Sequence, residues 1–212
     1  MIKLIEIYEK FFACYGDPKW WPANNSYEVI VGAILTQNTN WRNVEKAIEN
    51  FGDKLSPEFI METDCKNLIE IIKPAGFFNQ KANYLKAVTK WFEKYEFNVE
   101  KVKENDLFKL RRELLSVNGI GKETADSILL YAFNFPTFVV DAYTKRLLLR
   151  LPVELDHYHY DDIKKYFEIN LPKNFEIYNN FHAFIVINGK NHCKTIPVCN
   201  GCPLENICGK NK

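Results

Sequence analysis

Four cysteines near the C-terminus carry the clearest chemical signal in the sequence. They follow a C-x5-C-x2-C-x5-C pattern and are Cys193, Cys199, Cys202 and Cys208. Such gaps let one short irregular loop surround a single centre, and four thiolates are ligands for tetrahedral zinc or for a [4Fe–4S] cluster. The spacing alone leaves both groups open. Cys14 and Cys65 are isolated, and we expect them to be small buried side chains.

A second signal is a turn that contains two glycines. Gly119 and Gly121 bracket Ile120, and Lys122 and Thr124 then open an apolar segment. Glycine suits a sharp turn where φ is positive or where another backbone comes close. The first amides of a following helix lack partners within it and can bind phosphate. The pattern predicts helix, tight turn and helix with an anion site; a plain corner between two helices is the alternative.

A carboxylate and a group of tryptophans complete the candidate chemistry. Asp141 ends the apolar run Phe138-Val139-Val140, where it can cap a following helix. Trp20-Trp21-Pro22 and Trp41 supply indole rings, which bind cationic rings by stacking and cation–π attraction. For each tryptophan, a place in the hydrophobic core is the alternative.

Together the hairpin, the Val139-Val140-Asp141 segment and the four cysteines resemble the helix-hairpin-helix DNA glycosylases over about residues 20–208. The resemblance implies an all-α fold of two helical domains, with a cleft for DNA and the active site between them and a C-terminal iron–sulfur loop. It implies a central domain at 25–135, with the hairpin at about 107–133. Residues 1–24 plus 136–212 would form a discontinuous domain that carries Asp141 and the loop 193–208.

The resemblance also bears on the metal and on the reaction. The endonuclease III and adenine-glycosylase branches carry a C-x6-C-x2-C-x5-C loop here, which favours a [4Fe–4S] cluster over zinc, although the first gap is one residue shorter in this chain. Asp141 matches the catalytic aspartate of the family, which would stabilise the sugar cation and orient or deprotonate water. Helix capping by Asp141 is compatible with this role.

Bifunctional members of the family place a nucleophilic lysine two residues after the second hairpin glycine. In this chain that position is Glu123, and Lys122 stands one residue earlier, about 100° away around a helix. The Schiff-base route therefore lacks its nucleophile. The resemblance implies a monofunctional glycosylase without strong lyase activity.

A narrower resemblance concerns the base pocket. The stretches WWP, TQNT followed by Trp41, and GIGKE followed by AD resemble the 3-methyladenine DNA glycosylase III type, whose best-known form lacks the four cysteines. The positions that contact the flipped base in that type match Trp21, Pro22 and Trp41, with Glu123 beside them. Gln37 matches the glutamine that endonuclease III inserts into the emptied duplex; a cap at a helix end is the alternative.

The resemblance therefore implies removal of N-alkylated purines, such as 3-methyladenine, from double-stranded DNA by a monomer. Gln37 and the hairpin residues would contact the DNA, and a monovalent cation could bind at the hairpin. The hairpin residues are Gly119, Ile120, Gly121, Lys122 and Thr124. The alternatives are a uracil or thymine mismatch glycosylase and a non-catalytic protein that binds DNA structures.

The apolar spacing predicts the elements that must position these residues. Helical periodicity without sustained alternation predicts an all-α chain of about ten helices. They are expected at 3–15, 27–35, 41–51, after Ser56-Pro57, at 64–72, 79–95, 105–116, 122–133, 142–151, 160–170 and 174–188, with Asn188-Gly189 ending the last. His182 is expected to be a core histidine.

The composition limits the size of the hydrophobic core and the kinds of partner that the chain can bind. The 212 residues are 47% hydrophobic, enough for one good core or two small ones. The net charge of +1 gives no global basic signature for nucleic acid, so local patches would have to bind phosphates. No apolar run approaches the ~20 residues that span a bilayer, and the N-terminus lacks a signal-peptide pattern. We therefore expect a cytoplasmic protein that works at the chromosome.

Overall fold

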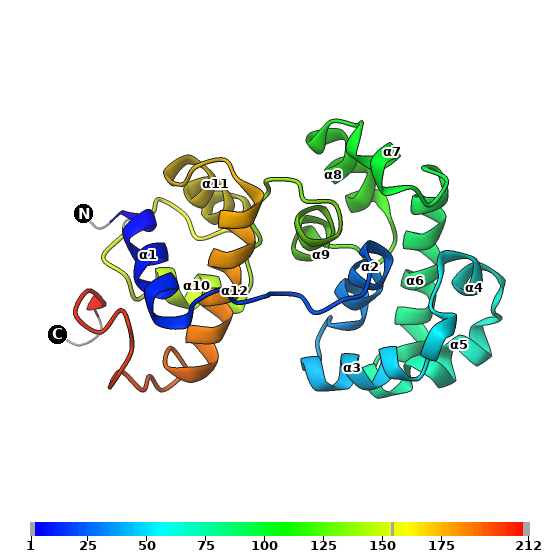
Figure 1. Cartoon of the computed structure of the whole chain (residues 1–212), viewed down its shortest axis with the longest axis horizontal. Helices are drawn as coiled ribbons and strands as arrows, with labels where there is room; N and C mark the ends of the chain where they lie inside the picture. Colours follow the sequence, from blue (N-terminus) through cyan, green and yellow to red (C-terminus); the bar gives the residue numbers. More distant parts are fainter. Residues whose placement is uncertain (1–2, 154, 210–212) are drawn as a thin grey trace. The chain divides into compact units, whose positions relative to one another are not determined.

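The computed structural model describes residues 3–153 and 155–209 and is all-helical over these ranges. The helices are α1 (Leu4–Tyr15), α2 (Ser26–Leu35), α3 (Trp41–Glu49), α4 (Pro57–Glu62), α5 (Cys65–Ile72), α6 (Phe78–Glu93), α7 (Val99–Lys103), α8 (Leu107–Ser116), α9 (Lys122–Ser127), α10 (Ala142–Leu148), α11 (Tyr160–Asn170) and α12 (Phe175–Asn191) (Figure 1). Two 3₁₀ turns, η1 (Gly52–Lys54) and η2 (Lys73–Ala75), and a π-helical turn, η3 (Ile128–Ala132), complete them. The all-α prediction is confirmed, and α7 is the one helix in the described ranges that was not predicted.

The chain divides into two compact units. Residues 23–135 form the central unit, and residues 1–22 with 136–212 form the terminal unit. The sequence-based division started the central domain at residue 25. Over the ranges that the structure describes, each helix is too short or too polar to cross a lipid bilayer.

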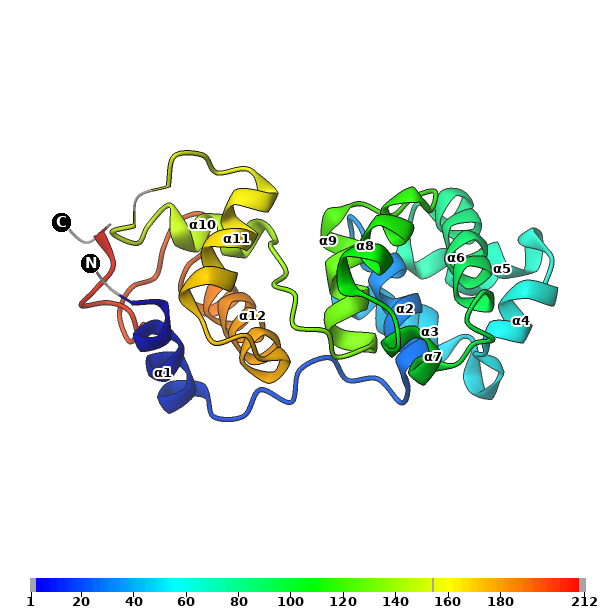
Figure 2. The same ribbon diagram turned by 90° about the horizontal axis from the view of Figure 1, so that it is seen from above.

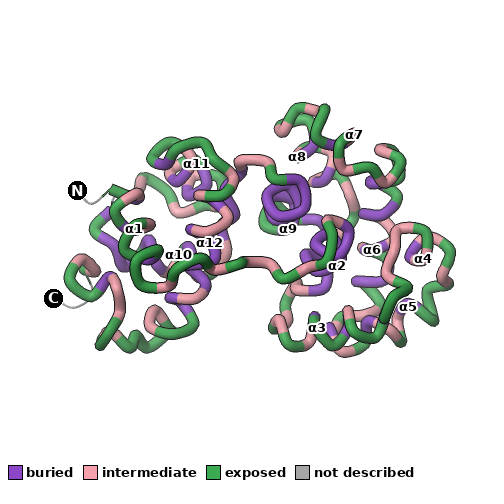
Figure 3. The backbone as a smooth tube through the Cα atoms, in the orientation of Figure 1, coloured by how far each residue is buried: buried purple, intermediate pink, exposed green. Residues whose placement is uncertain are grey.

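Helix α2 is the core of the central unit. Asn25 caps its start by accepting the amide of Glu28, and the helix packs against α3, α6, α9 and η3. Its residues from Tyr27 to Leu35 are buried (Figure 3). The polar stretch 36–40 ends the helix, and Asn40 caps α3 by accepting the amide of Asn43.

A buried lysine joins the start of α6 to the end of α2. Lys81 is 1% exposed, and its Nζ donates to the carbonyls of Leu35 and Ala75, both at 2.8 Å. Burial lowers the pKa of Lys81 to about 8. One turn earlier, Phe77 precedes α6 with a left-handed φ of 47° and a 60% exposed side chain. The contacts of Lys81 therefore tie the start of α6 to the end of α2.

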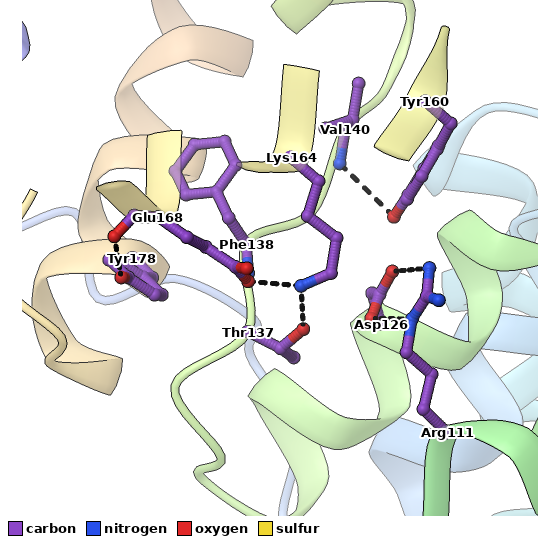
Figure 4. A network of polar contacts seen from close by, with 9 residues as sticks. All are labelled: Arg111, Asp126, Thr137, Phe138, Val140, Tyr160, Lys164, Glu168 and Tyr178. Atoms are coloured by element: carbon purple, nitrogen blue, oxygen red, sulfur yellow. Dashed lines mark hydrogen bonds and ion pairs between the residues drawn. The ribbon is translucent and has the colours of Figure 1, made fainter. Parts of the chain in front are cut away.

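The predicted helix–turn–helix is present as α8, the turn and α9. Gly119 has a φ of 83°, and a Cβ on it would lie 2.2 Å from the ring of Tyr84, so this position requires glycine. Arg111 of α8 holds the fully buried Asp126 of α9 through two hydrogen bonds of 2.9 and 3.0 Å (Figure 4). The expected helix at 122–133 is present up to Ala132, but after Ser127 it continues as the π-helical η3.

Helix α12 is the core of the terminal unit. Rings from α1, Tyr8 and Phe11, pack against Phe181 of α12, and α1 lies beside α12 in Figure 2. The expected end of this helix at Asn188-Gly189 is wrong, since α12 continues to Asn191. A Cβ on Gly189 would lie 2.3 Å from the ring of Tyr143 on α10. This glycine therefore permits close packing of two helices and does not terminate one.

Candidate functional site

Asp141 caps the first turn of α10. Its Oδ1 atom accepts the amide of Thr144 at 2.7 Å and the hydroxyl of the same residue at 2.9 Å. The predicted capping role is thus confirmed. The side chain remains 14% exposed. The site therefore contains an oriented carboxylate that solvent or a substrate can reach.

The extended segment before Asp141 is held by side chains of α11. Glu168 accepts the amide of Phe138 at 2.9 Å, and Lys164 donates to the hydroxyl of Thr137 at 2.6 Å while it pairs with Glu168 (Figure 4). The amide of Val140 lies 3.5 Å from the hydroxyl of Tyr160. The segment is extended but belongs to no β-sheet in the described residues, so these side chains provide the partners of its backbone amides. They also fix the position of the chain that leads to the carboxylate.

A histidine faces the same carboxylate. Nε2 of His182 lies 3.7 Å from Oδ2 of Asp141, and its side chain is 8% exposed. Burial lowers the pKa of His182, and the nearby charge of Asp141 partly opposes this. The expectation of a buried histidine is met, but its position beside the carboxylate was missed. The sequence holds no local pattern that links α12 to the start of α10.

In the central unit, the hairpin borders a hollow of about 310 Å³. It is lined by Ala33, Thr36, Gln37, Asn38, Gly119, Gly121, Glu123, Thr124 and Ser127. The side-chain amide of Gln37 donates to the Gly119 carbonyl and to the Thr124 hydroxyl, both at 3.0 Å. Gln37 thus holds the turn to the end of α2, a contact that the sequence did not predict.

The structure groups some of the predicted site residues and separates others by unit. The hollow unites Gln37 with Gly119, Gly121, Glu123 and Thr124, whereas Trp41 is not among its lining residues. Trp21 and Pro22 belong to the terminal unit with Asp141, while Trp41 belongs to the central unit with the hairpin.

The predicted pocket and hairpin residues also differ in exposure. Trp21, with a φ of 64°, and Trp41, which begins α3, are both half-buried. Ile120 is 6% exposed, and its amide donates to the Val117 carbonyl at 3.1 Å, whereas Lys122 and Glu123 are exposed.

The C-terminal cysteines share one small cavity. Cys193, Cys199, Cys202 and Cys208 line it together with Arg150 and Asn188. Arg150 is 7% exposed and its guanidinium donates to Sγ of Cys193 at 3.0 Å and to the Lys194 carbonyl at 2.7 Å. Burial raises the pKa of the Cys202 thiol, and Cys193 and Cys199 raise it further.

The donor set and its surroundings fit a group that binds thiolates, because a buried cation stands beside one of the sulfurs. Over the described ranges, no group of three or more cysteine, histidine or acidic side chains is arranged to bind one metal ion.

Cys14 and Cys65 are both exposed, so the expectation that they are buried is wrong.

Comparison with known proteins identifies the group to which these features belong. Residues 31–173 match the family model for HhH-GPD superfamily base excision DNA repair proteins. The chain is 50% identical to the candidate DNA repair glycosylase MJ1434 of Methanocaldococcus jannaschii, over 97% of this chain and 95% of that protein. It is 30% identical to endonuclease III of Sulfolobus acidocaldarius, over 87% and 82%.

A solved structure of the H. pylori 3-methyladenine DNA glycosylase MagIII, bound to 1,N6-ethenoadenine, is also similar. It superposes with a TM-score of 0.78 at 29% identity, and the match covers 89% of this chain and 98% of that one.

Proposed function

Because this chain belongs to the HhH-GPD superfamily of base excision DNA repair proteins, we propose that it is a monofunctional DNA glycosylase. It flips N-alkylated purines such as 3-methyladenine out of double-stranded DNA and removes them by hydrolysis. The observation that carries the proposal is the presence of a carboxylate at each of two positions, Asp141 and Glu123. Asp141 caps α10 in the terminal unit, and Glu123 occupies the hairpin position of the catalytic lysine in bifunctional relatives.

Asp141 supplies the charge that the reaction needs. Cleavage of an N-glycosidic bond builds positive charge on the sugar, and a fixed carboxylate stabilises it without reorganisation. Thr144 holds one oxygen of Asp141 in place. The other oxygen can face the sugar or accept a proton from the attacking water. An alkylated purine is a good leaving group, so no strong general acid is required.

The absence of a lysine at position 123 argues against a lyase step. A Schiff base requires an amine at the sugar carbon, and Glu123 cannot form one. Lys122 lies one residue earlier on the exposed first turn of α9. The protein should therefore leave intact abasic sites in DNA.

Aromatic residues support the choice of substrate. A 3-methylated adenine is cationic, and indole rings bind cationic rings by stacking and cation–π attraction. Trp21, Pro22 and Trp41 are the proposed contacts to the flipped base. The similarity to MagIII, whose structure holds a modified adenine, supports a purine lesion.

The central unit supplies the proposed DNA contacts. The amides at the start of α9 and the side chain of Lys122 would bind a phosphate of the DNA backbone. Gln37, which lies two residues after the end of α2, would enter the duplex beside the flipped nucleotide. Gln37 would then exchange its hydrogen bonds with the hairpin for contacts to DNA bases.

The cysteine cavity would hold a [4Fe–4S] cluster through Cys193, Cys199, Cys202 and Cys208. Four cysteines line one cavity, and an all-sulfur set of four ligands suits a [4Fe–4S] cluster. Arg150 would offset the negative charge of the ligands. The group would stabilise the loop and leave the glycosidic bond to Asp141.

The test is release of free bases from defined duplexes. The purified protein is incubated with DNA that contains 3-methyladenine, uracil or a thymine mismatch, and the released bases are quantified. We expect release of 3-methyladenine and no covalent adduct when borohydride is present. Preferred release of uracil or thymine would identify the protein as a mismatch glycosylase. Efficient borohydride trapping would contradict monofunctional chemistry. DNA binding without release of any base would identify the protein as a non-catalytic protein that binds DNA structures.

A further inference from the structure

The two oxygens of the Asp141 carboxylate have different neighbours. Oδ1 accepts the amide and the hydroxyl of Thr144 at 2.7 and 2.9 Å. Oδ2 faces the buried imidazole of His182, whose Nε2 is 3.7 Å away. Helices α10 and α12, which carry these residues, pack directly on each other. His182 is therefore held beside the oxygen that Thr144 does not bind.

The surroundings of His182 favour its neutral form. Burial lowers its pKa, and Asp141 at the start of α10 is the charged group that acts in the opposite direction. Helix α1 packs the rings of Tyr8 and Phe11 onto the adjoining turn of α12. A neutral imidazole has one N–H, and the lower-energy tautomer places the proton on the nitrogen that faces the carboxylate.

We propose that His182 is a positioning residue for Asp141: its neutral imidazole carries the proton on Nε2 and directs this N–H at Oδ2. The inference rests on the proposed function, in which Asp141 acts at the sugar. A neutral donor orients the carboxylate and leaves its charge intact, whereas an imidazolium would pair with it and weaken stabilisation of the sugar cation. The 3.7 Å gap exceeds a normal hydrogen bond, so the proposal requires Nε2 and Oδ2 to move closer together.

The position of the proton can be measured without DNA. The chain has four histidines, so ¹⁵N-histidine NMR signals can be assigned by comparing wild type with His182→Gln. We expect the proton of His182 on Nε2. The titration midpoint of His182 should fall in Asp141→Asn, because the carboxylate raises it. A proton on Nδ1, or a midpoint that Asp141→Asn leaves unchanged, would overturn the inference.

Kinetics test the consequence for catalysis. His182→Gln keeps an N–H donor at similar reach, and His182→Leu removes it. In single-turnover release of 3-methyladenine we expect a rate within about threefold of wild type for the glutamine variant and a loss of about tenfold or more for the leucine variant. Affinity for abasic DNA should be unchanged in both. His159→Gln, an exposed site in the same unit, is the matched control.

The pH profile adds a measurement that a purely structural role would not move. As the pH falls through the lowered pKa of His182, the imidazolium forms and the wild-type rate should fall. The glutamine variant should lack this step. Equal losses in the glutamine and leucine variants would mean that His182 serves folding alone, and normal rates in both would exclude it from the reaction. If wild type releases no base, the proposed function fails, while the NMR result still locates the proton.

Discussion

Gly119→Ala should destabilise the protein, and the size of the effect follows from two features of the turn. The φ of Gly119 is 83°, a conformation that costs a residue with a Cβ about 1–2 kcal/mol. The new Cβ would also lie 2.2 Å from Cδ1 and Cγ of Tyr84, at the rigid inner end of the ring. Displacing such a group costs about 1–3 kcal/mol. Together the two effects predict a loss of about 2–5 kcal/mol.

Gly121→Ala is the matched control two residues away. Gly121 has a φ of −90°, and no other residue within the described ranges lies near its added Cβ. The poorer N-cap costs about 1 kcal/mol or less, and the stiffer unfolded chain offsets much of this. If DNA backbone approaches Gly121, as proposed, a methyl group there should lower affinity for abasic DNA by about tenfold, or ~1.4 kcal/mol.

Thermal melting and fluorescence anisotropy separate the two glycines. At about 2–4 °C per kcal/mol for a chain of this size, Gly119→Ala should melt at least about 4 °C below wild type. Gly121→Ala should melt within a few degrees of wild type and bind abasic DNA more weakly. A Gly119→Ala protein with the wild-type melting temperature would refute the left-handed turn and the contact with Tyr84. Normal DNA binding by Gly121→Ala would refute the proposed contact between the DNA backbone and Gly121.

Further predictions concern the carboxylate, the metal and the base pocket. Asp141→Asn keeps a good helix cap, so it should melt and bind lesion DNA normally while excision slows on the order of a hundredfold or more; full activity would refute the mechanism. The purified protein should be brown, absorb near roughly 400 nm and contain iron and sulfide in about a 4:4 ratio; one zinc per colourless chain would assign zinc. Trp21→Ala and Trp41→Ala should each weaken 3-methyladenine excision by about 1–3 kcal/mol and leave abasic-site binding and melting almost unchanged. Trp91→Ala, at a core position that is 2% exposed, should lower the melting temperature and all activities together.

Helix starts could be predicted well from the sequence because a cap involves neighbouring residues only. Ser56, Asn40 and Asp141 each accept the amide three residues later, as their residue types indicate. Helix α11 likewise begins and ends where periodicity placed it. In these places the local chemistry and the tertiary structure favour the same conformation.

Helix interiors and ends were less predictable where tertiary contacts decide. Gly189 looks like a helix terminator in the sequence, but it is a contact point for Tyr143. The change from α9 to η3 occurs inside a continuous apolar stretch, where no residue type predicts a change of helix type. Helix α7 has only five residues, too few for periodicity to detect.

The candidate site shows the same division. The hairpin could be read from adjacent residues, and Gly119 has the positive φ that its turn requires. The bond from Gln37 to the hairpin joins positions 82 residues apart, and only the folded chain reveals it. His182 lies on an apolar helix face that reads as core, so its contact with Asp141 depended on how α10 and α12 pack.

Helix α12 links the carboxylate to the cysteine cavity within the terminal unit. His182 faces Asp141, and six residues later Asn188 accepts the hydroxyl of Tyr15 at 2.9 Å and lies 3.5 Å from Sγ of Cys202. At 1.5 Å per residue the two positions are about 9 Å apart along one rigid helix. Because Gly189 has no side chain, the same stretch of α12 packs closely against α10, which Asp141 caps. A group that orders the cysteine loop would therefore restrain the helix that carries His182. The loop would then affect the geometry of the carboxylate without taking part in the proposed cleavage step.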